Sequence, residues 1–226
     1  MLGRLEFVPG GRGRGGPEPL YGLEVVRVAA DPTGWTGKRR MARAGRTLRR
    51  FGVLRTLLPR DFGRWEWLER EGFCPVDPSP FLRANAGSLA KAGLERRGVA
   101  PERATVSLSG LRADGGMFRT AAQLCPKVRR LVIDVPRGGE ELAEQLRREF
   151  GIPVLPPGER ADLELRFQRE GQGNSPAAME LYGRNPKLDG MCLSCPELGE
   201  EDRDDLDLLA VLWERGKMNP ERVKIR

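Results

Sequence analysis

The sequence predicts an α/β protein with a parallel β-α-β-α-β unit at its centre. Between residues 105 and 155, short runs rich in β-branched residues alternate with amphipathic segments of helix length. The run at 131–135 is apolar except for Asp134, as expected of a strand that is covered on both faces. Strands that alternate with helices at this spacing pair in parallel through right-handed crossovers. A content of 39% hydrophobic and 31% charged residues is typical of a folded chain.

The boundaries of the central elements follow from these patterns. We expect the strands at 105–109, 131–135 and 152–155, and the helices at 115–124 and 139–150.

An N-terminal β-α-β lobe is expected to precede this unit. The β-branched content of 23–29 and 53–58 predicts strands, and an opening strand is expected at 2–8. Between them, residues 36–51 have the helical period, with Met41, Ala44 and Leu48 on one face. The segment 9–19, rich in glycine and arginine, is predicted to be a mobile loop. We divide the chain into a lobe at 1–75 and a domain at 76–226, or alternatively into one continuous sheet.

The segments around the central unit are predicted from the same periodicities. Residues 61–71 and 80–97 read as helices. Beyond residue 157, Leu163, Leu165 and Phe167 alternate with charged residues, which is typical of a half-exposed antiparallel strand. Residues 179–182 and 191–195 are expected to extend this antiparallel sheet, and a helix is expected at 205–215.

Composition excludes several kinds of site. The chain has no histidine, which removes imidazole bases, Ser-His-Asp triads and histidine-ligated metals. Its four cysteines include one isolated C-x-x-C pair, Cys192 and Cys195, and lack the spacing of a zinc site, so we expect free thiols and no metal. No apolar stretch approaches the length of a membrane span, and we expect a cytoplasmic protein without a membrane partner.

The positive charge is concentrated on the predicted helix at 36–51. The net charge is +7, and seven basic residues and no acid lie between Lys38 and Arg50. At helical spacing, one stripe of the helix carries Arg39, Arg43, Arg46 and Arg50, which is suited to a phosphate backbone or an acidic partner. The alternative is a solvated stripe, or one that is neutralised by the acidic run at 197–207.

A glycine-containing turn connects the first strand and helix of the central unit. Gly110-Leu111-Arg112-Ala113-Asp114-Gly115 resembles the G-x-G-x-x-G turn of the Rossmann-type dinucleotide-binding domain, with Arg112 at the middle glycine position. The resemblance covers residues 104–156. It implies that Gly110 and Gly115 approach a phosphate, which the guanidinium of Arg112 would also contact. The alternative is a degenerate Rossmann-like turn that binds no dinucleotide.

A second feature of that family is an acid at the end of the second strand. Asp134 has this position, and the resemblance implies that it accepts hydrogen bonds from ribose hydroxyls, with Arg137 near a 2′-phosphate. Otherwise, Asp134 simply caps the turn before the next helix.

Three hypotheses for the function follow. The first is a non-catalytic sensor or accessory protein that binds a nucleotide, such as NAD(P), or a small phosphorylated ligand at Gly110, Arg112, Gly115, Asp134 and Arg137. The second is binding of nucleic acid or an acidic partner by the arginine stripe. The third is an NAD(P)-dependent oxidoreductase, although the sequence identifies no catalytic acid or base.

Overall fold

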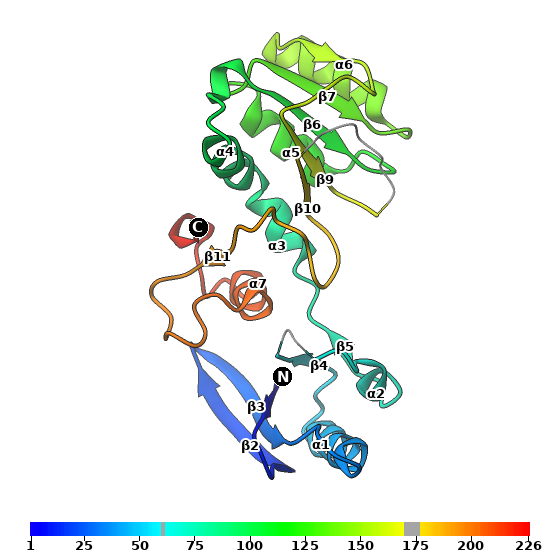
Figure 1. Ribbon diagram of the computed structural model, residues 1–226, viewed down its shortest axis with the longest axis vertical. Coiled ribbons are helices and arrows are strands. Elements are labelled where there is room, and N and C mark those ends of the chain that lie inside the picture. The colour runs from blue at the N-terminus through cyan, green and yellow to red at the C-terminus, as the bar shows by residue number, and fades with distance from the viewer. Residues whose placement is uncertain (60–61, 170–176) are drawn as a thin grey trace. The chain divides into compact units, whose positions relative to one another are not determined.

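The computed structural model describes residues 1–59, 62–169 and 177–226, which form two compact units. Unit 1 contains residues 1–77 and 214–217, and unit 2 contains residues 78–213 and 218–226. Each unit has its own five-stranded sheet rather than a share in one continuous sheet (Figure 1). The α/β class expected from the sequence is confirmed.

The sheet of unit 1 is mixed. Its strand order is β2-β3-β1-β4-β5, and β1 pairs in parallel with both of its neighbours, whereas β2 pairs antiparallel with β3. The elements of this unit are β1 (Leu2–Phe7), β2 (Arg12–Leu20), β3 (Leu23–Ala30), α1 (Gly37–Arg50), β4 (Arg55–Leu57), α2 (Glu66–Glu69) and β5 (Cys74–Pro75).

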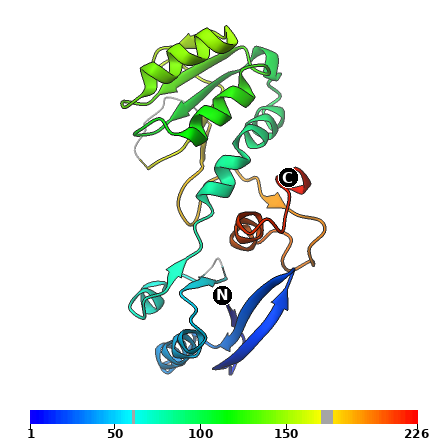
Figure 2. The same ribbon diagram turned by 180° about the vertical axis from the view of Figure 1, so that it is seen from behind.

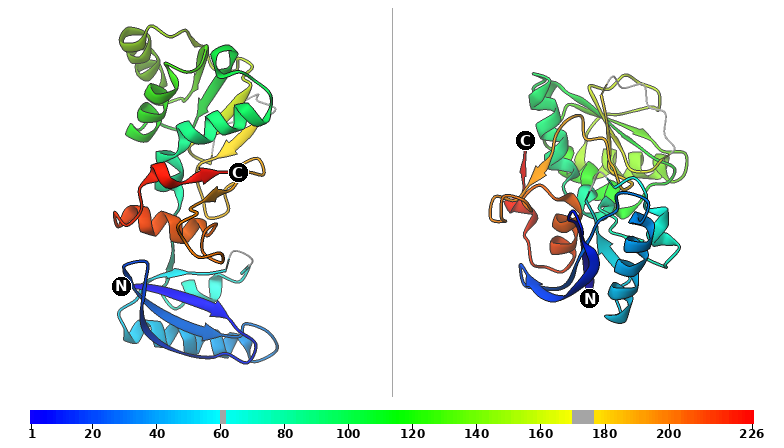
Figure 3. Two further views of the ribbon diagram at one scale, coloured as in Figure 1. Left: turned by 90° about the vertical axis from the view of Figure 1, so that its left-hand side faces the viewer. Right: turned by 60° about the horizontal axis from the view of Figure 1, so that its bottom comes forward.

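The prediction of a mobile loop at 9–19 is wrong, because most of this segment forms strand β2 beside α1 (Figure 3). Its glycines are required by close packing. Gly13 has a φ of +71°, and a Cβ there would lie 2.8 Å from the backbone nitrogen of Ala44 in α1. A Cβ on Gly15 would lie 1.8 Å from the carbonyl oxygen of Arg27. Glycine therefore allows this strand to lie against its neighbours, where the sequence suggested only flexibility.

Helix α1 forms as predicted, with its apolar face on the sheet. Met41, Ala44 and Leu48 are fully buried, and the arginines of the opposite stripe are exposed. The core around them contains Leu5, Val26, Val28, Ala30, Val53, Leu58, Phe62, Trp65, Leu68 and Phe73.

The sheet of unit 2 is parallel throughout. Its order is β10-β9-β6-β7-β8, so that along the chain its strands follow the Rossmann order 3-2-1-4-5. The chain moves outward from β6 to β8 and then returns to the other side of β6, which makes the β6–β9 junction the switch point. Unit 2 is therefore Rossmann-like. Its strands are β6 (Thr105–Ser109), β7 (Arg130–Asp134), β8 (Val154–Leu155), β9 (Leu163–Arg166) and β10 (Ala178–Glu180).

Helices pack on the apolar face of this sheet. Gly93 of α4 (Ala86–Arg96) lies against Leu163 and Met179, and Gly139 of α6 (Gly139–Phe150) lies against Ile133 and Val135. Helix α5 (Gly115–Leu124) contacts both α4 and α6 (Figure 2). In the described part of the chain, no helix is long and apolar enough to cross a membrane.

The helix predicted at 80–97 is divided into α3 (Ser79–Ala84) and α4 at Asn85. The buried Asn85 side chain donates to the carbonyl oxygen of Phe81, which satisfies the backbone at the break. The remaining elements of unit 2 are the short 3₁₀ turns Pro101–Arg103 and Pro220–Arg222, helix α7 (Leu206–Glu214, whose last residue belongs to unit 1), β11 (Leu193–Ser194) and β12 (Lys224–Ile225).

The antiparallel pairing predicted for the strand at 163–167 and its continuation at 179–182 is wrong, because β9 and β10 pair in parallel within the central sheet. The physical reason is Glu164, which is fully buried and not solvated as the alternating pattern suggested. Ser109 donates to this carboxylate at 2.7 Å, and Arg166 donates to both of its oxygens at 3.0 and 3.2 Å. Among the residues described after β10, β11 and β12 form an antiparallel pair.

Removing the cation of this buried pair tests its contribution to stability. Arg166→Leu leaves the Glu164 carboxylate buried beside Ser109 alone, and we expect unfolding free energy to fall by about 3 kcal/mol. The double variant Glu164→Leu/Arg166→Leu removes both charges and should lose clearly less than Arg166→Leu alone. Urea unfolding of both variants measures the difference, and equal or greater loss in the double variant would contradict it.

Candidate functional site

The turns after β6 and β7 are joined to each other at the carboxyl edge of the parallel sheet. The amide of Gly110 donates to the carbonyl oxygen of Asp134 at 3.2 Å. Beyond the strand ends, Arg112 and Arg137 form a further parallel bridge, and the Ala113 amide donates to the Arg137 carbonyl oxygen at 2.9 Å. Four of the residues predicted from the sequence thus lie together, because their two turns continue the pairing of the strands. The fifth, Gly115, begins α5 directly after the first turn.

Asp134 ends β7 with a half-buried side chain. Burial, and next to it the charge of Glu164, raise the pKa of the Asp134 carboxyl above its ordinary value. Within the described residues, this carboxylate accepts no side-chain hydrogen bond, and the exposed guanidinium groups of Arg112 and Arg137 have no acidic partner. A partly desolvated acid at the end of a strand, with two arginines without an acidic partner on the turns that follow, is an arrangement found at ligand sites.

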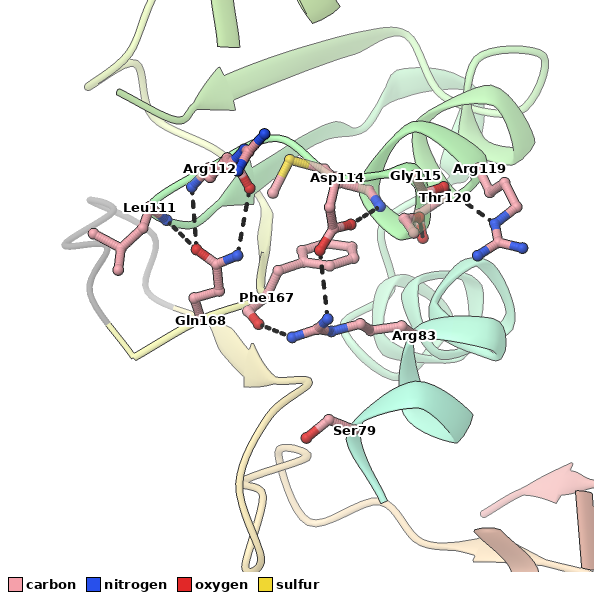
Figure 4. Close-up of polar contacts among 12 residues, drawn as sticks. Ser79, Arg83, Leu111, Arg112, Asp114, Gly115, Arg119, Thr120, Phe167 and Gln168 are labelled. Carbon is pink, nitrogen blue, oxygen red and sulfur yellow. Dashed lines mark hydrogen bonds and ion pairs between the residues drawn. The ribbon is translucent and has the colours of Figure 1, made fainter. Parts of the chain in front are cut away.

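The glycine turn itself is occupied by a side chain of the protein. Oε1 of Gln168 accepts hydrogen bonds from the amides of Leu111 at 2.7 Å and Arg112 at 3.1 Å (Figure 4). The Nε2 group of Gln168 donates to the Arg112 carbonyl oxygen at 3.4 Å. A phosphate that approached these amides would have to displace the carboxamide.

The start of α5 is capped by an acid. The Asp114 carboxylate accepts a hydrogen bond from the amide of Met117 at 2.9 Å, and lies 3.4 Å from a guanidinium nitrogen of Arg83. Arg83 also donates to the carbonyl oxygen of Phe167 at 2.7 Å (Figure 4). This carboxylate places negative charge at the helix N-terminus, the position that a pyrophosphate takes in dinucleotide-binding domains.

Sequence reasoning missed Gln168, Arg83 and Glu164. Gln168 contacts Leu111, Arg83 contacts Phe167, and Glu164 contacts Ser109. Each pair is more than fifty residues apart, and no local pattern in the sequence marks such a contact.

Two hollows flank the edge. One, of about 530 Å³, lies at the ends of β7 and β8 and is lined by Ile133, Val135, Leu155 and the start of α6. The other, of about 490 Å³, lies between α3 and α5 and is lined by Arg83, Arg119 and Trp213. Both volumes are within the range of small-molecule sites.

The arginines predicted for the alternative function lie in unit 1. Arg39, Arg43 and Arg46 line one hollow of α1 together with Arg12 and Arg40, whereas Arg50 is exposed and is not among the lining residues.

Comparison with known proteins adds little to this description. No protein-family model matches the chain, and no curated protein is significantly similar in sequence. Among solved structures, an L-tryptophan dehydrogenase from Nostoc punctiforme is 17% identical with a TM-score of 0.33, over 64% of this chain and 44% of that chain. A shikimate 5-dehydrogenase from Listeria monocytogenes, in complex with shikimate and NAD, is 10% identical with a TM-score of 0.28, over 74% of this chain and 67% of that chain. Similarity at this level carries no argument about function, and the Rossmann-like assignment rests on strand order and direction.

The raised pKa of Asp134 makes stability depend on pH in a defined direction. Because the folded state binds the proton of Asp134 more tightly, this residue stabilises the fold least above its folded pKa and more as the pH falls toward its ordinary pKa of about 4. We expect Asp134→Asn to be more stable than the wild type at pH 7 and to lose that advantage near pH 4. Thermal melting across this range measures the difference, with Glu144→Gln on the exposed face of α6 as control. A constant offset at all pH values would contradict the assignment.

Proposed function

We propose that the protein binds a nucleotide or a similar phosphorylated ribose ligand at the carboxyl edge of unit 2. In this proposal, Asp134 accepts hydrogen bonds from the ribose hydroxyls, and the guanidinium groups of Arg112 and Arg137 contact the phosphate. The observation that carries it is the joining of the two turns, which holds the two arginines together at the end of the strand that carries Asp134. The edge also lies beside the switch point, where open parallel sheets bind their ligands.

The phosphate contact is assigned to side chains rather than to backbone amides. In a glycine-rich turn, the amides hold the phosphate, but here those of Leu111 and Arg112 bind Gln168. Arginine forks bind phosphate with two parallel hydrogen bonds and do not require that the backbone be free. The substitution of arginine for the middle glycine and the occupation of the amides by Gln168 are therefore consistent with each other.

A binding role is proposed in preference to catalysis because two of the acids near the edge have partners within the protein, and the third, Asp134, is assigned to the ribose. Glu164 is bonded to Ser109 and Arg166, and Asp114 caps α5 and pairs with Arg83. Neither carboxylate is available as a general base in this arrangement. An NAD(P)-dependent oxidoreductase would also require Gln168 to leave the turn, so that the amides of Leu111 and Arg112 hold the pyrophosphate.

Ligand-induced thermal shifts test the proposal. We expect at least one of NAD⁺, NADP⁺, ATP or AMP to stabilise the wild type, by about 2.7 kcal/mol at one hundred times its dissociation constant. Asp134→Ala and the double variant Arg112→Ala/Arg137→Ala should each reduce affinity at least tenfold, since each removes charged hydrogen bonds to the ligand. Arg148→Ala, which removes an exposed arginine of α6, is the matched control.

The thermal shifts of the wild type and the variants distinguish between the proposed function and its alternatives. A ligand that stabilises the wild type and all variants equally binds elsewhere, which would overturn the site. The absence of any shift across the panel would overturn the function. Stabilisation by a nicotinamide dinucleotide that becomes stronger in Gln168→Ala would favour the oxidoreductase alternative, because that substitution frees the amides of the turn.

A further inference from the structure

Unit 1 contains a hollow that is lined almost entirely by arginine. It measures about 530 Å³, and its lining residues are Arg12 from β2, Arg39, Arg40, Arg43 and Arg46 from α1, and Ala42. The helix alone would present a stripe of charge. The additional arginine from β2 turns this stripe into a groove with cations on two sides.

Most of this charge is uncompensated. Arg40 pairs with Asp31 and donates to the Thr36 hydroxyl at 2.6 Å. Within residues 1–59, 62–169 and 177–226, Arg12, Arg39, Arg43 and Arg46 have no acidic partner. Like charges at this spacing repel one another, and a bound polyanion relieves that repulsion.

The backbone around the groove is held in place by specific contacts. At Gly13, β2 crosses α1 so closely that no side chain fits, and the hydroxyl of Thr47 donates to the Gly13 carbonyl oxygen at 2.8 Å. The carboxylate of Asp31 accepts the amides of Gly10 at 3.0 Å and Thr33 at 2.9 Å, which fixes both segments that lead into the groove. Arg12 is therefore presented to α1 by a packed strand and not by a free loop.

An aromatic side chain stands at the start of the same helix. Trp35 is 95% exposed and immediately precedes Thr36, the N-cap of α1. Tryptophan is on average largely buried, and Trp35 lies four residues before Arg39 in the sequence, outside helix α1 and not among the residues that line the groove. A basic groove and an exposed aromatic ring together are the combination by which single strands are bound, with arginines along the backbone and a base stacked on the ring.

We propose that this groove of unit 1 binds single-stranded nucleic acid. The arginines contact successive phosphates, and Trp35 stacks on a base. Arg39 and Arg46 are separated by about 10 Å along the helix axis, so they can contact different phosphates of one strand. A protein partner fits less well, because the hollow offers Ala42 as its only apolar lining residue, whereas protein interfaces have an apolar core depleted of charge.

Salt-dependent binding of labelled oligonucleotides to the full chain is the decisive experiment. The probes are dodecamers of deoxyuridylate and uridylate, which differ only in the sugar, and a mixed-sequence duplex of equal length, measured by fluorescence anisotropy. With four phosphates neutralised, the affinity for the single strands should fall about 50-fold between 50 and 200 mM salt. The triple variant Arg39→Gln/Arg43→Gln/Arg46→Gln should lower the magnitude of the log–log slope by about 2. Trp35→Ala should weaken binding about tenfold without changing that slope.

The matched control removes the same charge elsewhere. Arg103→Gln/Arg129→Gln/Arg148→Gln replaces three exposed arginines of unit 2 that form no ion pair within the described residues. This control should bind like the wild type, and unchanged melting temperatures would show that all variants fold. Equal loss in the two triple variants, tighter binding of the duplex than of the single strands, or no binding at 50 mM salt would each overturn the proposal. Different affinities for the two single-stranded dodecamers would support it and indicate which sugar the groove prefers.

Discussion

The architecture of unit 2 depends on a buried carboxylate at the centre of its sheet. Glu164 lies on β9, and its hydrogen bond to Ser109 of β6 connects the strands on either side of the switch point, while Arg166 of β9 itself supplies the opposite charge. An isolated charge at this depth would be costly, and three hydrogen bonds compensate it. The contact aligns the end of β9 with the end of β6, which positions Gln168 against the glycine turn. The positions of the candidate site residues therefore follow from the pairing of the strands in the sheet.

Much of the fold was predictable because it depends on local periodicity. Helix α1, strands β6 and β7, and helices α5 and α6 form where their apolar spacing predicts them. The errors occur where a distant contact overrides the local pattern. Strand β2 is rich in glycine because α1 and β3 lie directly against it, and β9 alternates polar and apolar residues because one carboxylate has buried partners. The contacts of Gly13 with Ala44 and of Glu164 with Ser109 join residues that are far apart in sequence.

The candidate site was predictable in part for the same reason. The resemblance to a dinucleotide-binding turn singled out Gly110, Arg112, Asp134 and Arg137, and they lie together because the turns after two parallel strands share one edge. The arginine groove was recognised as a stripe on one helix, but Arg12 was assigned to a loop. In both units the sequence indicated candidate residues on one element, and the packing of a second element placed further residues next to them.

Gln168 lowers the affinity of the glycine turn of unit 2 for any ligand that binds its backbone amides. Its carboxamide accepts two backbone hydrogen bonds, and a ligand that takes these amides must offset both. At about 1 kcal/mol each, the internal acceptor lowers the apparent affinity of such a ligand by about thirtyfold. A compound with a single weak acceptor does not gain enough free energy to displace the carboxamide. A compound that also binds nearby arginines gains additional free energy that offsets this cost. For the proposed ligand, the carboxamide would therefore be an internal competitor for these two amides.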